Sequence, residues 1–350
     1  MTRLGITMDY SDDFATVASD VVAFEKAGAD VVEVAEAYSF DAVSRLGYLA
    51  AVTSTITLAS GILPLYSRTP TLIAMTAAGL DSVSGGRFEL GLGTSGPQVI
   101  EGFHGVPFAT PLAHVRETVE ICRSVWRRER VEHTGKAYTI PLPADQGTGL
   151  GKPLKIINAL VRESIPISIA SLAPKAVAQT AEIANGWLPL FYHPERAHLA
   201  WGESLAAGAA LRDPALGRLD TIVSVPLFIG DSVEPYLEAY RQRIALYVGG
   251  MGARNANFYN DLAVRYGYVD EAERVQELYL AGEKAAAAAV LPEELLTSTA
   301  LIGTEAHVRE RLAAFKESGA TTIIVMPLAQ TSAARIESVE AARAMLNELG

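Results

Sequence analysis

The sequence predicts an α/β fold of the (β/α)8, or TIM barrel, type. Short apolar runs rich in β-branched residues recur along the chain, and most are followed by a stretch in which apolar residues recur every three or four positions. Eight such runs are found, and eight strands alternating with helices suggest a closed parallel barrel rather than an open sheet. We expect a single barrel domain over residues 1–350.

The expected elements follow one another in order. After the first run, 4–8, apolar residues spaced three and four apart indicate a helix with one buried face, which Gly28 ends. The other expected strands are 30–34, 56–60, 87–92, 165–170, 187–190, 222–229 and 321–326. Helices are expected at 41–52, at 70–83 and from Pro111, where the buried stripe would be Leu112, Val115, Val119, Cys122 and Trp126.

Two segments are too long for ordinary connections. Residues 130–155 are rich in glycine and proline, with a strand expected around 138–142, and residues 234–297 are mostly helical and rich in alanine. We expect both excursions to cover the barrel mouth or to form a subunit contact. A third segment, 46–67, is uncharged but rich in β-branched and hydroxyl residues, which favours a helix end, a strand and a turn over a membrane span.

Composition excludes several classes of protein. The chain has 40 acidic and 29 basic residues, for a net charge of −11, and no basic run longer than Arg127-Arg128, so neither a nucleic-acid surface nor a polybasic membrane anchor is expected. The single cysteine, Cys122, excludes an internal disulfide. Acidic residues at positions 9, 12 and 13 interrupt any signal-peptide core. We therefore expect a cytoplasmic protein with a small-molecule substrate.

Candidate site residues follow the strands, because the active site of such a barrel lies at the carboxyl ends of its strands. Glu36 follows the second strand, where a carboxylate needs a polar ligand or a partner. It is therefore a candidate catalytic residue, or else it pairs with a barrel arginine or caps the helix that begins at Asp41. After the third strand, Gly61 followed by Ile62 permits a bulge that directs a side chain into the cavity, although an ordinary turn fits as well.

The next two strand ends are rich in small residues. Thr94, Ser95 and Gly96 belong to a loop in which backbone amides can approach a flat ring or a phosphate. Residues 170–173 precede a proline in the first turn of a helix, which leaves free amides for an anion. Lys175 adds a cation there or is simply solvated.

Other chemistries find little support. The aromatic residues of 187–193 either sandwich a ring or pack in the core. The sequence contains no zinc-protease, EF-hand, P-loop or nucleophile-elbow motif, and its six histidines lack ligand spacing, so no metal site is predicted. His104 is the one histidine close to the glycine-rich loop.

Several blocks resemble the bacterial-luciferase-like (LLM class) superfamily of flavin and deazaflavin oxidoreductases. They are 68–94, which contains the Ser-Gly-Gly-Arg-Phe block at 84–88, then 170–187, and finally 301–312. The stretch 245–259 is similar to the actinobacterial branch assigned to coenzyme F420. The resemblance spans essentially the whole chain and implies a luciferase-like barrel that acts as an F420-dependent oxidoreductase.

The resemblance also implies roles for individual residues. The family has a non-prolyl cis peptide that backs the cofactor ring, and it falls here at Gly61-Ile62. The loop of Thr94, Ser95 and Gly96, with Gln98 beyond it, would line the ring, and Glu36 would face it. The implied phosphate site consists of Ala170, Ser171, Leu172, Ala173 and Lys175.

The chain departs from its relatives in two places. Several relatives have a histidine after the acid, where this chain has Ala37, and some have a glutamate in the region of Gly96-Pro97-Gln98. A histidine-dependent sugar-phosphate dehydrogenation is therefore not expected, and Tyr38, Tyr66 or a substrate group would supply protons. We expect hydride transfer between F420 and a carbonyl, alkene or imine. The alternatives are an FMN-dependent monooxygenase and a non-catalytic flavin-binding protein. A homodimer would be typical of the family.

Overall fold

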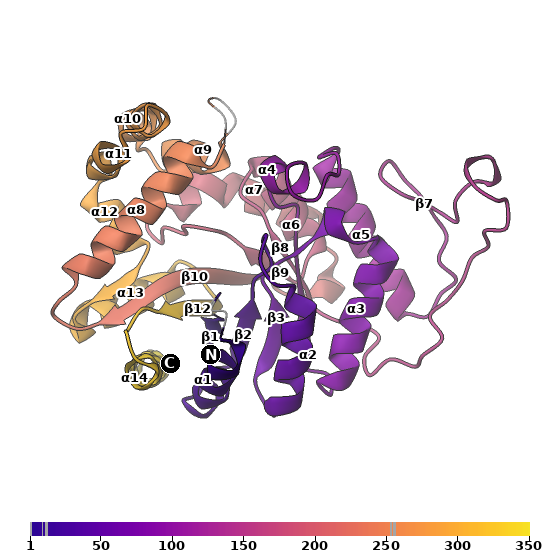
Figure 1. Ribbon diagram of the computed structural model, residues 1–350, viewed down its shortest axis with the longest axis horizontal. Helices are drawn as coiled ribbons and strands as arrows, with labels where there is room; N and C mark the ends of the chain where they lie inside the picture. Colours follow the sequence, from indigo (N-terminus) through magenta and orange to yellow (C-terminus); the bar gives the residue numbers. More distant parts are fainter. Residues whose placement is uncertain (1, 9, 11–12, 253, 255–256) are drawn as a thin grey trace.

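Eight parallel strands close into a barrel in the computed structural model, which describes residues 2–8, 10, 13–252, 254 and 257–350 (Figure 1). The strands pair in chain order and the last returns to the first. They are β1 (Arg3–Thr7), β2 (Val31–Val34), β3 (Thr57–Ser60), β5 (Phe88–Gly93), β8 (Ile167–Ala170), β9 (Gly186–Leu188), β10 (Asp220–Ile229) and β12 (Thr322–Pro327). The predicted (β/α)8 barrel is confirmed. Asp9 and Asp12, used above, lie outside the described residues.

Helices surround the barrel on its outside. They are α1 (Phe14–Lys26), α2 (Ala42–Val52), α3 (Pro70–Val83), α5 (Pro111–Trp126), α6 (Pro174–Ile183), α7 (Ala197–Leu211), α13 (Glu305–Glu317) and α14 (Ser332–Glu348). Asp13 and Asp41 cap α1 and α2 by accepting the amide hydrogens of Thr16 and Ser44. Four of the five residues of the predicted α5 stripe are buried, whereas Leu112, in the first turn, is exposed.

Short elements complete the chain. They are β4 (Leu63–Pro64), α4 (Pro97–Ile100), β11 (Leu301–Gly303) and the 3-10 turns Leu65–Ser67, Ala144–Gln146 and Pro214–Leu216. The uncharged segment 46–67 forms the end of α2, β3, β4 and a turn, as predicted. Within the part of the chain described here, no helix has both the length and the apolar character needed to cross a membrane.

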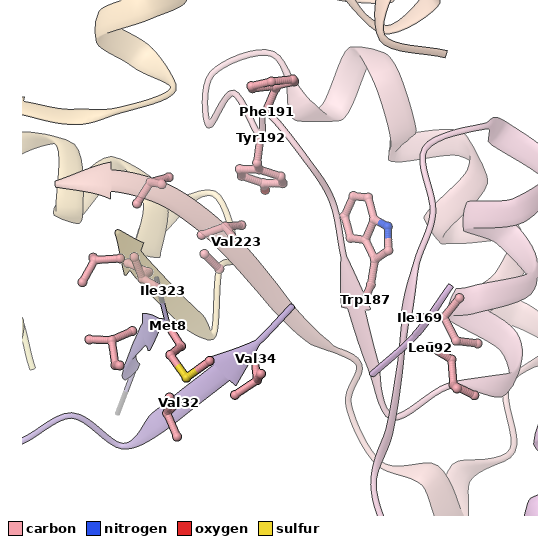
Figure 2. Packing of buried hydrophobic residues seen from close by; sticks show 14 of the residues in the cluster. Met8, Val32, Val34, Leu92, Ile169, Trp187, Phe191, Tyr192, Val223 and Ile323 are labelled. Carbon is pink, nitrogen blue, oxygen red and sulfur yellow. The ribbon is translucent and has the colours of Figure 1, made fainter. Parts of the chain in front are cut away.

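Each barrel strand is buried on two faces. In β2, Val32 and Val34 belong to the large core between sheet and helices, where Trp187 of β9 and Val223 of β10 also lie (Figure 2). Val31 belongs instead to the small apolar cluster of the barrel interior. Because side chains alternate along a strand, Glu33 shares the interior face with Val31. The barrel therefore contains a carboxyl group at the level where β2 ends.

The first excursion follows α5 and projects from the barrel (Figure 1). Its hairpin, β6 (His133–Thr134) and β7 (Thr139–Ile140), is fastened to α5 because the Glu117 carboxylate accepts hydrogen bonds from the amides of Lys136, Ala137 and Tyr138. The predicted strand at 138–142 is only the two residues of β7. Beyond the hairpin, Leu150 and Ile157 are largely exposed.

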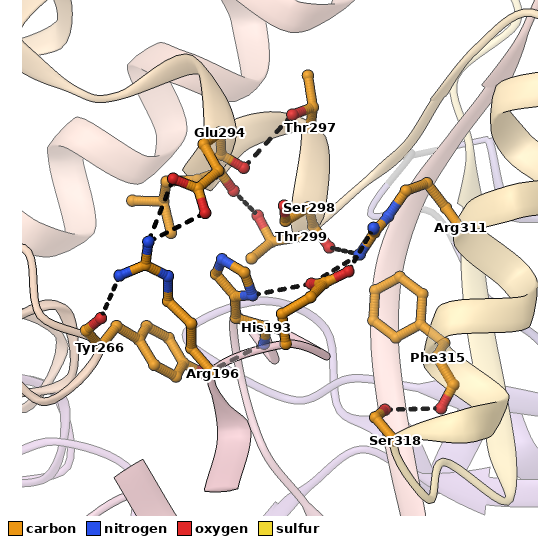
Figure 3. A network of polar contacts seen from close by, with 12 residues as sticks. His193, Arg196, Tyr266, Glu294, Thr297, Ser298, Thr299, Arg311, Phe315 and Ser318 are labelled. Carbon is orange, nitrogen blue, oxygen red and sulfur yellow. Dashed lines mark hydrogen bonds and ion pairs between the residues drawn. The ribbon is translucent and has the colours of Figure 1, made fainter. Parts of the chain in front are cut away.

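The second excursion is helical, as predicted, and lies between β10 and β11. It consists of α8 (Glu234–Gly250), α9 (Phe258–Arg265), α10 (Val269–Leu280), α11 (Lys284–Val290) and α12 (Glu293–Ser298). A polar network joins it to the loop after β9 (Figure 3). Arg196 donates to Glu294 of α12 over 3.0 Å, and Arg311 of α13 joins Glu195 at 2.6 Å. Burial lowers the pKa of the neighbouring His193 to about 4, so this histidine is neutral at pH 7.

Candidate functional site

The predicted cofactor residues meet at the carboxyl ends of three neighbouring strands. β3, β5 and β8 lie side by side, and Leu92 of β5 is in register with Ile169 of β8. A Cβ added to Gly93 would lie 3.0 Å from the Ile62 side chain and 3.5 Å from the Cβ of Ala170. The Gly61-Ile62 peptide is cis, as the resemblance implied. The predicted third-strand and fifth-strand residues are thus brought together over Gly93, whose lack of a side chain lets Ile62 and Ala170 approach.

The loop after β5 presents small polar groups beside them. Thr94, Ser95 and Gly96 are partly buried, and Ser95 adopts a left-handed φ of 57°, which is uncommon for a residue other than glycine. Gln98, in the short α4, is exposed. The loop therefore offers backbone and hydroxyl groups at the barrel mouth.

The loop before α6 has free amides. The Trp187 and Trp201 indole N–H groups donate to the carbonyls of Ser171 and Leu172 over 3.0 and 2.9 Å, so these carbonyls face the core. Among the described residues, the amides of Ser171, Leu172 and Ala173 have no acceptor. Ala173 is the N-cap of α6 and provides no side-chain cap. The partial positive charge of this helix start is therefore available to an anion.

Two side chains of this loop, Ser171 and Lys175, are not directed at a common point as they would be in a simple phosphate site. The Ser171 hydroxyl is buried and lies 2.9 Å from the Thr180 hydroxyl, so its oxygen is engaged within the protein. Lys175 is exposed, and no acidic group of the described chain pairs with it. An anion at this helix start would therefore meet mainly backbone amides.

Glu36 is held by two local partners. Its carboxylate accepts two hydrogen bonds from the Arg68 guanidinium, at 2.5 and 3.0 Å, and one from the amide of Ala42 at 2.8 Å. Both side chains are largely buried. The pairing and capping that sequence reasoning left open are therefore both observed, with an arginine from the loop before α3 rather than from a barrel strand. Glu36 is not among the residues that line the cavity described next.

A cavity of about 800 Å³ opens at the same end of the barrel. It is lined by residues of β1, β2, β10 and β12, by the loop after β9, and by α1, α8 and α14. Its apolar lining includes Ile6, Met8, Val17, Val21, Phe24, Phe191, Val225 and Leu246. Phe191 lines the cavity, whereas Trp187 is a core residue. Core packing, one of the two interpretations of segment 187–193, therefore holds for Trp187, and Phe191 is available to a ligand. The volume suits a small organic ligand.

Glu33 lies at the floor of this cavity and was not predicted. Its side chain packs against Gly61, where an added Cβ would fall 2.1 Å from the Glu33 Cδ. No described residue donates a hydrogen bond to its carboxyl group, and burial raises its pKa to about 7. The signal available in the sequence was a glutamate within the apolar strand Val-Val-Glu-Val. A group that titrates near neutral pH inside a cavity is suited to proton transfer.

The other candidate proton donors are less well placed. Tyr38 is exposed, and Tyr66 donates its hydroxyl hydrogen to the carbonyl of Ala109 over 2.7 Å. Burial raises the pKa of Tyr66 to about 12, which makes it a weak acid. His104 is partly buried, and its ring does not line the cavity.

A (β/α)8 barrel with a glycine-rich floor, a free helix N-terminus and a cavity at the same end has the architecture of a barrel enzyme. The chain belongs to the luciferase-like monooxygenase family, whose model matches residues 1–322. It is 40% identical, over 92% of its length and 94% of the relative's, to Rv3520c of Mycobacterium tuberculosis, which is provisionally named a coenzyme F420-dependent oxidoreductase.

Solved structures of similar proteins share the fold. The coenzyme F420-dependent tetrahydromethanopterin reductase of Methanopyrus kandleri superposes with a TM-score of 0.77 at 21% identity, and 97% of each chain is covered. An F420-dependent secondary alcohol dehydrogenase, solved with an F420-acetone adduct, gives a TM-score of 0.72 at 16% identity and covers 98% of this chain and 99% of its own. At these identities the likeness establishes the fold alone.

Proposed function

We propose that this protein is a coenzyme F420-dependent oxidoreductase, which transfers a hydride between the deazaflavin and a small organic carbonyl, alkene or imine. The observation that carries the proposal is the free N-terminus of α6 beside the cis Gly61-Ile62 peptide. These two features, after β8 and β3, flank the end of β5, and together they support an anion site next to a floor for a flat ring. The 40% identical relative, which is named for coenzyme F420, supports the same cofactor.

The residues present fit F420. Gly61, Ile62 and Gly93 form the floor for a ring, the loop of Thr94, Ser95, Gly96 and Gln98 borders it, and Ala170, Ser171, Leu172, Ala173 and Lys175 would hold the phosphate through amides and one cation. When bound, the deazaflavin supplies the hydride chemistry. The protein orients the ring and the substrate and excludes water from the apolar cavity.

Glu33 provides a proton at the cavity floor. Below about pH 7 its carboxyl group is neutral, and a protonated oxygen can donate to a substrate atom in the cavity. Ala37, in place of the family histidine, motivated the alternative of a non-catalytic binding protein. The presence of Glu33 favours an enzyme over a non-catalytic binding protein, because its carboxyl group can supply the proton that the missing histidine would have supplied.

Titration of the purified protein with F420, followed by fluorescence, tests the cofactor. We expect saturable binding of F420, and binding of FMN at least about tenfold weaker because the proposed site is specific for the deazaflavin. Saturation by FMN with none by F420 would contradict the proposal and support an FMN-dependent monooxygenase.

A Glu36→Gln variant separates the two roles of this residue. We propose that Glu36 acts at the site, either directly on the ring or by fixing the loop that carries Arg68. Because the substitution leaves the largely buried Arg68 without its carboxylate, we expect the free energy of unfolding in urea to fall by about 2 kcal/mol.

The matched control is Glu129→Gln, which removes an exposed ion pair with Arg127 and should lower the free energy of unfolding far less. Equal stability of Glu36→Gln and the wild type would contradict the structural role. Loss of F420 affinity at unchanged stability would assign Glu36 to the ring.

A cytoplasmic homodimer completes the proposal. Exposed apolar side chains on the neighbouring helices α2 and α3 support the dimer; they are Tyr48, Val52, Leu72, Met75 and Val83. Gly47 and Gly79, on the same two helices, have no neighbouring atom within 4 Å, so another helix can approach closely. The lone free cysteine, Cys122, suits a reducing compartment.

A further inference from the structure

The positive and negative charges of the side chains described in the large cavity do not cancel. Among the residues that the structure describes, four charged side chains line it: Asp20, Glu33, Arg243 and Arg335. Asp20 and Arg335 form an ion pair at 2.7 Å, so they neutralise each other. Glu33 is buried on the barrel floor, where its neutral form is favoured up to about pH 7. Of the charged side chains described in this wall, Arg243 is the one left without a compensating charge.

Arg243 has no acidic partner within the described part of the chain. It extends from α8, and its Nη1 lies 3.7 Å from the Met326 sulfur, a weak acceptor. Its guanidinium carbon is 5.9 Å from the centre of the Tyr247 ring. By contrast, Arg3, Arg68 and Arg311 pair with carboxylates. A partly buried guanidinium without a carboxylate is able to bind an anionic ligand, and its planar fork matches a carboxylate.

The rest of the wall is suited to an apolar body. Val17, Val21 and Phe24 of α1 and Val225 of β10 line the cavity. The lining tyrosine Tyr240 has its hydroxyl occupied by Thr299. In a protein with a net charge of −11, the overall field repels anions, so recognition of an anion depends on a local cation.

We propose that the cavity takes a substrate with an apolar body and a single carboxylate, and that Arg243 binds this carboxylate and so determines specificity. The inference rests on the proposed function, because it places the substrate in the cavity that adjoins the cofactor floor. Glu33 and Gly61, at the opposite side from α8, face the reacting part of the molecule, while the carboxylate is directed toward α8.

The test compares two probes that differ by one charge. Binding of trans-cinnamate and of its uncharged amide, cinnamamide, is measured by calorimetry on the full-length protein without cofactor. We expect the wild type to bind cinnamate about tenfold more tightly than cinnamamide, as one charge-assisted pair allows. In Arg243→Gln this preference should disappear, and Arg243→Lys should keep part of it. The control is Arg274→Gln, which removes the same charge from the exposed face of α10 and should bind as the wild type does.

The outcomes that overturn the proposal are distinct. Equal binding of the two probes by the wild type would overturn it, as would a preference for cinnamate that persists in a folded Arg243→Gln protein, or the absence of binding at millimolar cinnamate. A fall of F420 affinity in Arg243→Gln, with cinnamate binding unchanged, would assign the arginine to the cofactor instead. If the wild type binds cinnamate through Arg243 but does not bind F420, only the proposed function fails.

Discussion

Replacing Ala173 by aspartate should stabilise the fold and weaken cofactor binding at the same time. Ala173 is the N-cap of α6, and its φ of −68° and ψ of 141° already suit a capping residue. An aspartate carboxylate there would accept the free amides of the first turn, which raises the free energy of unfolding by about 1 kcal/mol. The same carboxylate would add a negative charge beside the amides of residues 171–173 proposed for the F420 phosphate, and would repel the phosphate. We expect F420 affinity to fall by at least about tenfold.

Opposite changes in two measurements make this test robust. Thermal unfolding reports the gain in stability, and F420 fluorescence titration reports the loss of affinity. Ala173→Asn is the matched control, because it caps the helix without a charge and should weaken binding less. An Ala173→Asp protein that binds F420 as tightly as the wild type would show that the phosphate lies elsewhere. Position 171 is a poorer choice, since the Ser171 hydroxyl is buried against Thr180.

Replacing Glu33 by glutamine should change how stability depends on pH. The pKa of Glu33 is raised to about 7 in the folded protein, from an ordinary value of 4.5, because the carboxyl group is buried. The folded state therefore keeps the proton to a higher pH than the unfolded chain does. The stability associated with Glu33 is fully present below about pH 4.5 and is lost as the pH rises through about 7. Through this group alone, the wild type should be less stable above about pH 7 than below about pH 4.5, by about 3 kcal/mol.

The difference between wild type and variant isolates the effect. Thermal unfolding of both proteins is followed by circular dichroism at pH 5 and at pH 8.5. We expect the melting temperature of Glu33→Gln, measured relative to that of the wild type, to be higher at pH 8.5 than at pH 5. His193 titrates alike in both proteins, and burial raises the pKa of the nearby Tyr10 above its usual 10, out of this range. The exposed Glu203→Gln of α7 serves as control and should follow the wild type. Parallel pH profiles for Glu33→Gln and the wild type would contradict a buried, proton-bearing Glu33.

The barrel was predictable because its signals are local. The periodicity of two and of three to four residues, and caps such as Asp13 and Asp41, act within a few positions. Most strand boundaries were accordingly correct within two residues. The excursion at 130–155 was less predictable because its hairpin depends on Glu117, which lies in α5 and bonds amides about twenty positions away.

That the candidate residues gather at one end of the barrel was predictable, but the surroundings of the acidic residues were not. Residues after β3, β5 and β8 gather because the carboxyl ends of parallel strands meet at one end of a barrel. The partner of Glu36 is Arg68, 32 positions away, and no local pattern indicates that pairing. Glu33 was missed because its environment depends on which face of β2 turns inward, and closure of the barrel decides this. The position of Arg243 likewise depends on how α8 packs over the strands.

The helical excursion divides the molecule into two parts that can evolve separately. α8 and its Arg243 enter the chain after β10, whereas the proposed cofactor residues lie at the ends of β3, β5 and β8. A mutation or recombination within residues 234–297 therefore alters the wall opposite the cofactor floor and leaves the floor's framework intact. Gene duplicates of such a barrel can acquire new substrates through this segment while they keep the same redox partner.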